Sequence, residues 1–271
     1  MRTGRRDLII GGGLGALAAG TVSAAPTAPA PADQATLTAP GARLEMAIRF
    51  TRGGVERGRE RATCTVNANG TLTLSARSES RDPRVVRDTT YLLAPDHRPL
   101  AAFVLMTNDG RPDWWAQYRF TDGAVEMEGW GVDGRRGAGR FPLQRPVAAF
   151  VTHAVATDMF VARAADRARP GEVVRTLVHL SSADPYGRTG PEFVAREVGV
   201  RITDGGLVAT PLGPLRADHV ELHLPDATGS LQPFQDMWCL AGTPIFLRSR
   251  ARPPYDTLYE LTALEFFPPG A

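Results

Sequence analysis

Lysine is absent from the 271-residue sequence, in which all 31 Lys+Arg positions hold arginine. A protein without lysine has no Schiff-base lysine, no phosphate-loop lysine and no Ser-Lys catalytic pair. The string G-x-S-x-G, typical of serine hydrolases, and the string H-E-x-x-H, typical of zinc proteases, are missing as well. These absences remove several enzyme classes and leave no catalytic residue that the sequence alone identifies.

One short string resembles a dinucleotide-binding turn, but its surroundings argue against that function. Residues 13–18, GLGALA, fit the pattern G-x-G-x-x-G/A. The apolar run before them, Leu8–Ile10, is too short for a central parallel strand, and Pro26 and Pro29 prevent a long helix after them. We therefore expect no nucleotide and no other cofactor.

The N-terminal segment has the parts of a secretory signal peptide. A basic start contains Arg5 and Arg6, an apolar run covers 8–19, and small residues at 22–24 form an A-x-A-like cleavage site. The Arg5-Arg6 pair resembles the twin-arginine type. We predict that residues 1–24 are a twin-arginine-type signal peptide that is cleaved after export.

This signal predicts a protein exported to the periplasm or outside the cell, with the twin-arginine export machinery and a signal peptidase as partners. The alternative is an uncleaved membrane anchor, because the apolar run is close to the minimum length of a span. Residues 1–24 hold three of the 31 basic and one of the 29 acidic residues, so their removal balances the two charges. Balanced charge gives no support to a nucleic-acid partner.

The rest of the chain predicts a linker and one domain. Residues 25–42, rich in alanine and proline, are typical of a linker, and residues 43–268 are predicted to form a single β domain. In Arg43–Thr51 apolar and polar residues alternate, as in a strand with one buried face. Strands are predicted at 43–51, 55–66, 71–79, 85–93, 100–106, 113–121, 124–132, 172–181, 193–203, 206–210, 215–224, 236–241, 244–250 and 256–266. Turns rich in Gly, Asn and Asp separate them.

One segment departs from this alternation. In residues 147–166 apolar residues recur every three or four positions without a turn residue, which predicts one helix, or a broken one. The predicted fold is therefore mainly β, with one long antiparallel meander and a helical segment. About fourteen strands are too many for a flat sheet, because native twist curls long sheets into an open or half barrel.

The order of these features resembles exported bacterial β proteins of unknown function, in which a single antiparallel sheet curls into an open or half barrel. The segments that carry the resemblance are LEMAIRFTRGGVERGRERATCTV, YLLAPDHRPLAAFVL, WWAQYRFTDGAVEMEGW, VATPLGPLRADHVEL, DMWCLAGTPIFLRSR and LYELTALEF, with an apolar segment containing His153 and Asp158 between the third and fourth. The resemblance implies the fold and no reaction.

Histidines supply the few candidate polar sites. His219 and His223 have the i, i+4 spacing of a zinc helix, but their segment alternates as a strand, in which they lie about 13 Å apart. We therefore expect no metal site there. His153 with Asp158, and His97 with the preceding acidic residue, are candidate acid/base pairs, although local structural roles are favoured for both.

The two cysteines, Cys64 and Cys239, predict a disulfide, because an even count in an exported protein favours one. Two buried, unpaired thiols are the alternative. A disulfide across so long a loop would stabilise the protein by roughly 4 to 5 kcal/mol in the chain-entropy model.

Aromatic residues gather in one predicted hairpin. The adjacent residues Trp114 and Trp115 must point to opposite sides of the sheet, so one of them is expected in the core. We predict that a curled sheet encloses an apolar site beside the helical segment. The predicted ligand-binding residues are Trp130, Trp115, Met127, Phe150, His153 and Met159. The alternative is that these side chains complete a dry core.

The predicted function is therefore an exported, soluble β-barrel-like protein that binds or carries an apolar small molecule or lipid. Two alternatives stay open. One is an enzyme whose acid/base residues, such as His97 or His153, meet only in the fold. The other is a structural module that binds a partner protein.

Replacement of Arg5 and Arg6 by lysines should block export, because the twin-arginine pathway reads that pair. Mass spectrometry of the secreted protein should show an N-terminus at or near Ala25. An exported protein that still carries residues 8–19 would contradict cleavage and support the anchor.

Overall fold

The computed structural model describes residues 37–81, 83–184 and 186–270. Its strands are β1 (Arg43–Arg52), β2 (Val55–Val66), β3 (Leu72–Arg81), β4 (Arg84–Leu93), β5 (Pro99–Asn108), β6 (Arg111–Phe120), β7 (Ala124–Gly131), β8 (Arg136–Pro142), β9 (Ala149–Val151), β10 (Val174–Leu180), β11 (Val194–Thr210), β12 (Gly213–Pro225), β13 (Leu231–Leu240), β14 (Phe246–Ala251) and β15 (Thr257–Phe267). All fifteen belong to one sheet.

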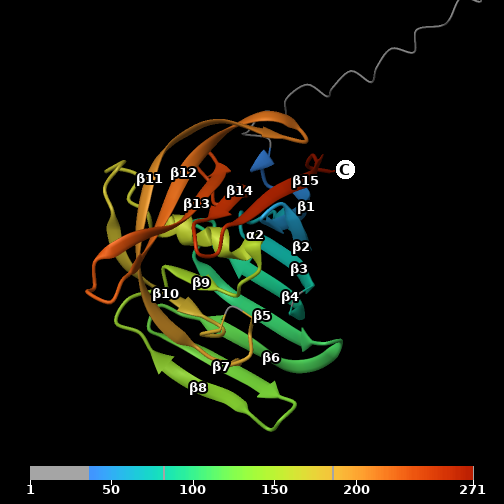
Figure 1. Ribbon diagram of the computed structural model, residues 1–271, viewed down its shortest axis with the longest axis vertical. Coiled ribbons are helices and arrows are strands. Elements are labelled where there is room, and N and C mark those ends of the chain that lie inside the picture. Colours follow the sequence, from blue (N-terminus) through green and yellow to red (C-terminus); the bar gives the residue numbers. More distant parts are fainter. Residues whose placement is uncertain (1–36, 82, 185, 271) are drawn as a thin grey trace, which may run out of the picture.

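The chain enters this sheet in its middle. From β1 it runs strand by strand to β8, crosses to β9 at the opposite end and returns to β15, which pairs with β1 (Figure 1). Neighbouring strands are antiparallel, except that β9 runs parallel to β10. The sheet is open, because β8 and β9 are its two ends. The fold is mainly β, one long meander curled into an open barrel, as the sequence predicts.

Alternation of side chains creates an inner and an outer face. In β1, Leu44, Met46, Ile48 and Phe50 are buried, while the residues between them are partly or fully exposed. Successive residues of a strand point to opposite faces, so one face of each strand joins a common core. We call the face toward this core the inner face and the opposite one the outer face.

Outside residues 147–166, β11 and β8 depart most from the predicted strands. The sequence DGG, expected to form a turn, lies within β11, which runs unbroken from Val194 to Thr210 with a register shift between Asp204 and Gly206. A Cβ on Gly205 would lie 2.8 Å from a backbone nitrogen of β12, so glycine permits a bulge where the sequence predicts a turn. The other strand, β8, was not predicted, because small residues replace the apolar residues of a recognisable pattern.

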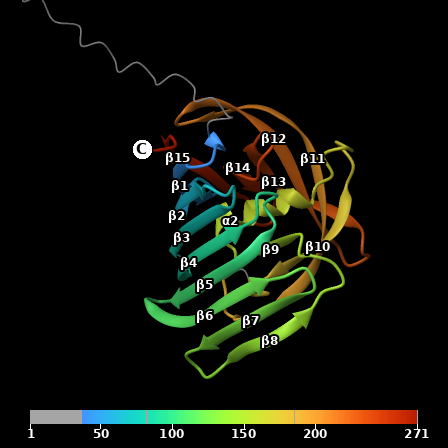
Figure 2. The ribbon, with the colours of Figure 1, turned by 180° about the vertical axis from the view of Figure 1, so that it is seen from behind.

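The predicted helical segment, residues 147–166, is broken into three pieces. It contains β9, a short helix α2 (Val155–Asp158) and a 3₁₀ helix η1 (Met159–Ala164). His153 has a positive φ of 64°, which a continuous helix does not allow. We call residues 147–166 the plug, because α2 lies inside the curl of the sheet (Figures 1 and 2).

The loop between β10 and β11 covers more of the inner face. Trp114 Nε1 donates a hydrogen bond to the Gly187 carbonyl at 2.5 Å, and the Tyr118 hydroxyl donates to the Glu192 carbonyl at 2.8 Å. Trp114 is 2% exposed, so of the two adjacent tryptophans it is the core residue. The plug and this loop together fill the concave side with the protein's own atoms.

The N-terminal predictions lie largely outside the described residues, which begin at residue 37. Residues 1–24 and 25–36 are therefore not placed. Leu37, still within the predicted linker, is 1% exposed and belongs to the hydrophobic core. Among the described residues, no helix combines the length and the apolar character that a membrane crossing requires.

The predicted disulfide is wrong, because both cysteines are buried free thiols. Cys64 lies in β2 and Cys239 in β13, with β1, β15 and β14 between them in the sheet. Adjacent strands are about 4.8 Å apart, whereas a disulfide requires Cα atoms within about 7 Å. Burial raises the pKa of each thiol to about 12.

Iodoacetamide should leave Cys64 and Cys239 unmodified in the folded protein, because the thiols are buried and the reactive thiolate is disfavoured. Addition of 6 M guanidinium without any reductant should expose both to alkylation. Intact-mass spectrometry distinguishes the states. A protein that needs reductant before it can be alkylated would contradict the free thiols.

Candidate functional site

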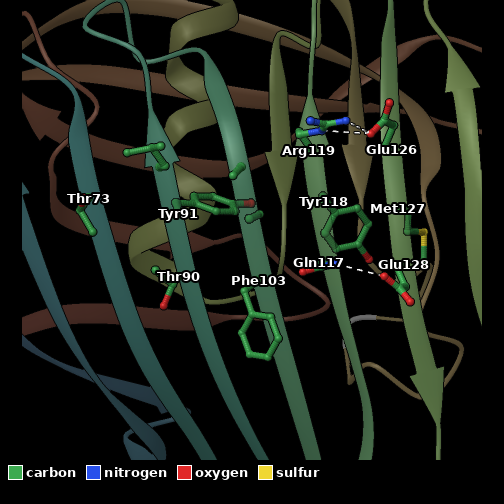
Figure 3. A pocket seen from close by; sticks show the side chains of 13 residues that line it. Thr73, Thr90, Tyr91, Phe103, Gln117, Tyr118, Arg119, Glu126, Met127 and Glu128 are labelled. Atoms are coloured by element: carbon green, nitrogen blue, oxygen red, sulfur yellow. Dashed lines mark hydrogen bonds and ion pairs between the residues drawn. The ribbon is translucent and has the colours of Figure 1, made fainter.

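A groove of about 720 Å³ runs across the outer face of β3 to β7 (Figure 3). We call it the outer groove. Residues whose side chains point outward form its walls. Residues whose side chains point inward border its floor. The lining residues are Thr73, Thr90, Tyr91, Leu92, Ala101, Ala102, Phe103, Gln117, Tyr118, Arg119, Glu126, Met127 and Glu128.

The strand register arranges these residues in two rows across the sheet. One row contains Thr90, Phe103, Gln117 and Glu128 on successive strands. The second row contains Thr73, Leu92, Ala101, Arg119 and Glu126. Each row has a hydroxyl at the β3–β4 side, apolar groups in the middle and charged groups at the β6–β7 side. The groove is therefore polar at its two ends and apolar between them.

Exposed apolar side chains form the middle of the groove. Phe103 is 41% exposed and Leu92 is 38% exposed, unusual values for large apolar residues of central strands. The Phe103 ring stacks on the Trp115 ring with centroids 6.2 Å apart. Trp115 pairs across the strands with Trp130, which carries the Arg136 guanidinium over its ring at 4.7 Å. The aromatic surface thus continues from the groove toward β8.

Hydrogen-bonded pairs form the charged end. Arg119 Nε donates to Glu126 Oε2 at 3.0 Å, and Gln117 Nε2 donates to Glu128 Oε2 at 3.2 Å (Figure 3). These four side chains contribute two carboxylates and one guanidinium, and Arg140 of β8 lies directly opposite Glu126 in the register, so the charges at this end balance. All four side chains are presented toward solvent as hydrogen-bonding groups.

The structure divides the six predicted ligand-binding residues between the two faces of the sheet. Trp115 and Trp130 lie on the outer face beside the groove. Met127, Phe150 and Met159 are at most 5% exposed and point inside the curl, although Met127 also borders the outer groove. His153, in the plug, is partly buried. These residues therefore do not meet in one interior pocket.

Close packing explains why the inward-pointing residues line no common pocket. The Phe150 ring lies 4.5 Å from the Tyr118 ring and 5.2 Å from the Phe120 ring, centroid to centroid. The plug brings its own apolar side chains to the inner face, so ring–ring contacts occupy the space that a ligand would need.

Sequence reasoning missed two buried charged residues, Glu60 and Arg87, which form a polar cluster with the partly buried His153 and Asp158. The Glu60 carboxylate accepts hydrogen bonds from the amides of Val155 (2.8 Å) and the following residue (2.7 Å), at the start of α2. Arg87 Nη1 donates to the His153 carbonyl at 2.6 Å. Charged side chains from β2 and β4 thus hold the plug to the sheet.

Burial shifts the titration of this cluster. Desolvation raises the pKa of Asp158 to about 7, although Arg87 opposes this shift, and it lowers the pKa of His153 to about 4. It also raises the pKa of Glu60 and lowers that of Arg87. Three of its side chains bond to backbone atoms of the plug, which supports a structural role.

His153 and Asp158 do not form the candidate acid/base pair through their side chains. Asp158 Oδ1 accepts from the backbone amide of His153 at 3.0 Å, while the His153 ring nitrogen Nε2 lies 2.9 Å from the Ser182 carbonyl. The carboxylate therefore fixes the backbone at the start of α2. Both residues serve the local structural role that the sequence favours.

A second, smaller pocket of about 240 Å³ lies beside the β4–β5 turn, where His97 and Asp96 are placed. Asp96 accepts from Arg163 Nη2 at 3.0 Å, and it does not bond to His97. Burial is the main reason that the pKa of His97 is lowered. Arg163 and Arg167 are each ion-paired, so the pocket offers no free cation.

The two histidines with zinc-helix spacing lie on a strand, as predicted. His219 and His223 are in β12, on either side of Glu221. His219 Nε2 lies 3.0 Å from Asp236 Oδ1, and His223 Nε2 lies 2.7 Å from Glu221 Oε1. The two histidines therefore lie beside different carboxylates, each of which also pairs with Arg252. Within the described part of the chain, no group of three or more His, Cys, Asp or Glu residues is placed to hold a metal.

Comparison with known proteins shows no sequence family. No family model matches the chain, and no curated protein matches it. Solved structures with similarity include a β-barrel-like protein of domain of unknown function DUF1849 from Brucella abortus, with 13% identity and a TM-score of 0.49, covering 83% of this chain and 97% of that one.

Two further structures are more distant. The hypothetical lipoprotein YmcC from Escherichia coli has 11% identity and a TM-score of 0.31, covering 86% of this chain and 89% of that one. A DUF1329 family protein from Desulfovibrio piger has 10% identity and a TM-score of 0.23, covering 86% and 88%. These neighbours are bacterial proteins, and their low identities and TM-scores assign no family and no activity to this chain.

Asp158→Asn should remove a pH dependence of stability. The pKa of Asp158 in the folded protein, about 7, lies above its ordinary value of 3.8, so the folded state binds this proton more tightly. The carboxyl's contribution to the free energy of unfolding therefore falls as pH rises from about 4 to about 7. Urea denaturation measures the free energy of unfolding of the wild type and of Asp158→Asn at each pH. The wild-type value minus the variant value should fall by on the order of 3 kcal/mol across that range.

Asp109→Asn, a change in an exposed turn, serves as the control and should leave the pH profile of the wild type intact. The asparagine at position 158 keeps an oxygen that accepts the amide hydrogen bonds. A wild-type minus Asp158→Asn difference that stays constant with pH would contradict a raised pKa.

Proposed function

We propose that this protein is an exported β protein that binds a lipid-like amphiphile in the outer groove. The observation that carries the proposal is the exposed apolar surface of Phe103 and Leu92 in the middle of a groove with polar ends. Large apolar side chains left exposed on central strands mark a binding surface.

The size of the groove suits a small molecule. Its volume of about 720 Å³ falls within the roughly 300 to 1,000 Å³ typical of ligand sites. A ligand that covers Phe103 and Leu92 gains the hydrophobic free energy of burying their exposed parts, about 1 kcal/mol for each. The Trp115 ring, stacked on Phe103, supports the floor and keeps it rigid.

The polar ends determine which amphiphile fits. The apolar middle suits an acyl chain or a flat hydrocarbon, while Arg119, Gln117 and the two glutamates suit a head group with hydrogen-bonding atoms. The charges at this end balance, because Arg140 lies opposite Glu126, so neither an anionic nor a cationic head group gains a net attraction. A neutral lipid, such as a monoacylglycerol, therefore satisfies the groove best.

Export belongs to the same proposal. The basic start with Arg5 and Arg6, the apolar run and the small-residue site of residues 1–24 support it. An exported protein meets lipids at membrane surfaces, where a groove open to solvent is accessible to them.

Phe103→Ala should weaken binding of N-phenyl-1-naphthylamine, a neutral apolar fluorophore, by about tenfold, because it removes the exposed ring from the groove. The wild type should bind the dye saturably at about one site, and monoolein should displace it. Fluorescence titration gives the dissociation constants, and circular dichroism checks that each variant is folded.

Tyr255→Ala is the matched control, since Tyr255 is 50% exposed and lies in the β14–β15 turn, outside the groove lining. It should bind the dye like the wild type. A folded wild type without saturable binding, or equal affinities of wild type and Phe103→Ala, would overturn the proposal.

A further inference from the structure

The two ends of the open sheet differ in their environment. At one end, β9 is covered, because the Tyr91 hydroxyl donates to the Phe150 carbonyl at 2.6 Å and Arg163 Nη1 donates to the Ala148 carbonyl at 3.3 Å. At the other end, β8 is exposed over most of its length. Exposed edge strands are templates for pairing with another chain.

The register shows which backbone groups of β8 are free. Gly131 N donates to the Arg135 carbonyl and Leu143 N donates to the Gly123 carbonyl, at 2.7 and 2.9 Å. Antiparallel pairs alternate between bonded and non-bonded positions, so the odd-numbered residues of β8 bond to β7. The residues whose N–H and C=O groups point away from the sheet are Arg136, Ala138 and Arg140.

No hydrogen bond within the described residues is recorded for these outward backbone groups. The neighbouring positions hold Gly137 and Gly139, and Ala138 has only a methyl group, so no bulky side chain covers the middle of the edge. Three consecutive outward positions are enough to bind a short extended segment.

The edge also has a definite charge. Between residues 134 and 157 the chain contains no aspartate or glutamate. Arg136 and Arg140 are on the outer face, and neither makes an ion pair within the described part of the chain. Arg136 lies over the Trp130 ring, and Arg140 lies opposite Glu126 of β7. Two arginines thus flank Ala138 on the same face.

We infer that the β8 edge binds an extended acidic peptide segment of a partner protein, which adds a sixteenth strand to the sheet. Backbone hydrogen bonds to Arg136, Ala138 and Arg140 supply general affinity, and cross-strand carboxylates opposite the two arginines supply selectivity. This site is separate from the outer groove and does not depend on a ligand there.

Charge argues against a second copy of this chain as the occupant. An antiparallel pair of β8 strands centred on Ala138 would place Arg136 of one copy opposite Arg140 of the other. A parallel, in-register pair would place like arginines side by side. Like charges at directly opposed positions destabilise a sheet, whereas an acidic strand neutralises both arginines.

The probe is a fluorescein-labelled heptapeptide of alternating threonine and glutamate, with the threonine–lysine counterpart as the control peptide. Fluorescence anisotropy at low salt should show binding of the acidic peptide only. Amide exchange measured by NMR should slow at Arg136, Ala138 and Arg140 when the peptide binds.

Ala138→Pro removes the central free N–H without breaking a bond to β7, so it should weaken peptide binding at least about tenfold while the thermal midpoint stays unchanged. The double variant Arg136→Glu/Arg140→Glu should also lose binding. Its matched control, Arg61→Glu/Arg111→Glu, makes the same charge change at exposed positions of paired strands and should bind like the wild type.

Absent binding of the acidic peptide, equal binding of the lysine peptide, or unchanged binding to Ala138→Pro would each overturn the inference. Sedimentation tests whether a second copy of this chain occupies the edge instead. A wild type that is dimeric, with an Ala138→Pro variant that is monomeric, would show that a second copy covers the edge and would overturn the inference. Phe103→Ala should bind the peptide normally, which distinguishes failure of this edge from failure of the groove.

Discussion

The fold depends on the contact of one buried carboxylate with the plug. Glu60, on the inner face of β2, accepts hydrogen bonds from the backbone N–H groups of Val155 and Ala156. N–H groups in the first turn of a helix have no carbonyl partner within the helix, so Glu60 supplies the missing acceptor for α2. Arg87, from β4, binds the backbone just before them at His153. A curled sheet of this size needs something to cover its concave side, and these charged groups determine where that cover attaches. Their burial is costly unless they remain paired, so the plug has one favourable position.

This attachment explains why the two faces differ in character. The inner face is filled by the plug and by the loop before β11, so its apolar side chains stabilise the core. The outer face carries apolar groups, Phe103 and Trp115 among them, that the core does not use. Because the interior of the open sheet is filled, its outer face and its β8 edge are the parts of the sheet that stay accessible to solvent.

Alternation made most of the sheet predictable, because residues such as Leu44 and Met46 recur with period two. The same alternation could have revealed the polar cluster, because Glu60 and Arg87 occupy inward positions at which apolar residues are expected. The face of Phe103 was not predictable, because its neighbours in AAFVLM are all apolar and only the register with adjacent strands decides it. The disulfide prediction failed because an even cysteine count carries no information on distance.

The pairing of β1 with β15 has a consequence for how the chain folds. Arg43 lies opposite Phe267, so strands at the middle of the sheet are joined by residues far apart in sequence. Such non-local contacts close slowly, because the entropy of the intervening chain is lost before the contact forms. During synthesis β1 can pair with β2 at once, but its other edge stays open until β15 leaves the ribosome. The half from β1 to β8 must therefore persist as an incomplete sheet, in which chaperones have an exposed strand to protect.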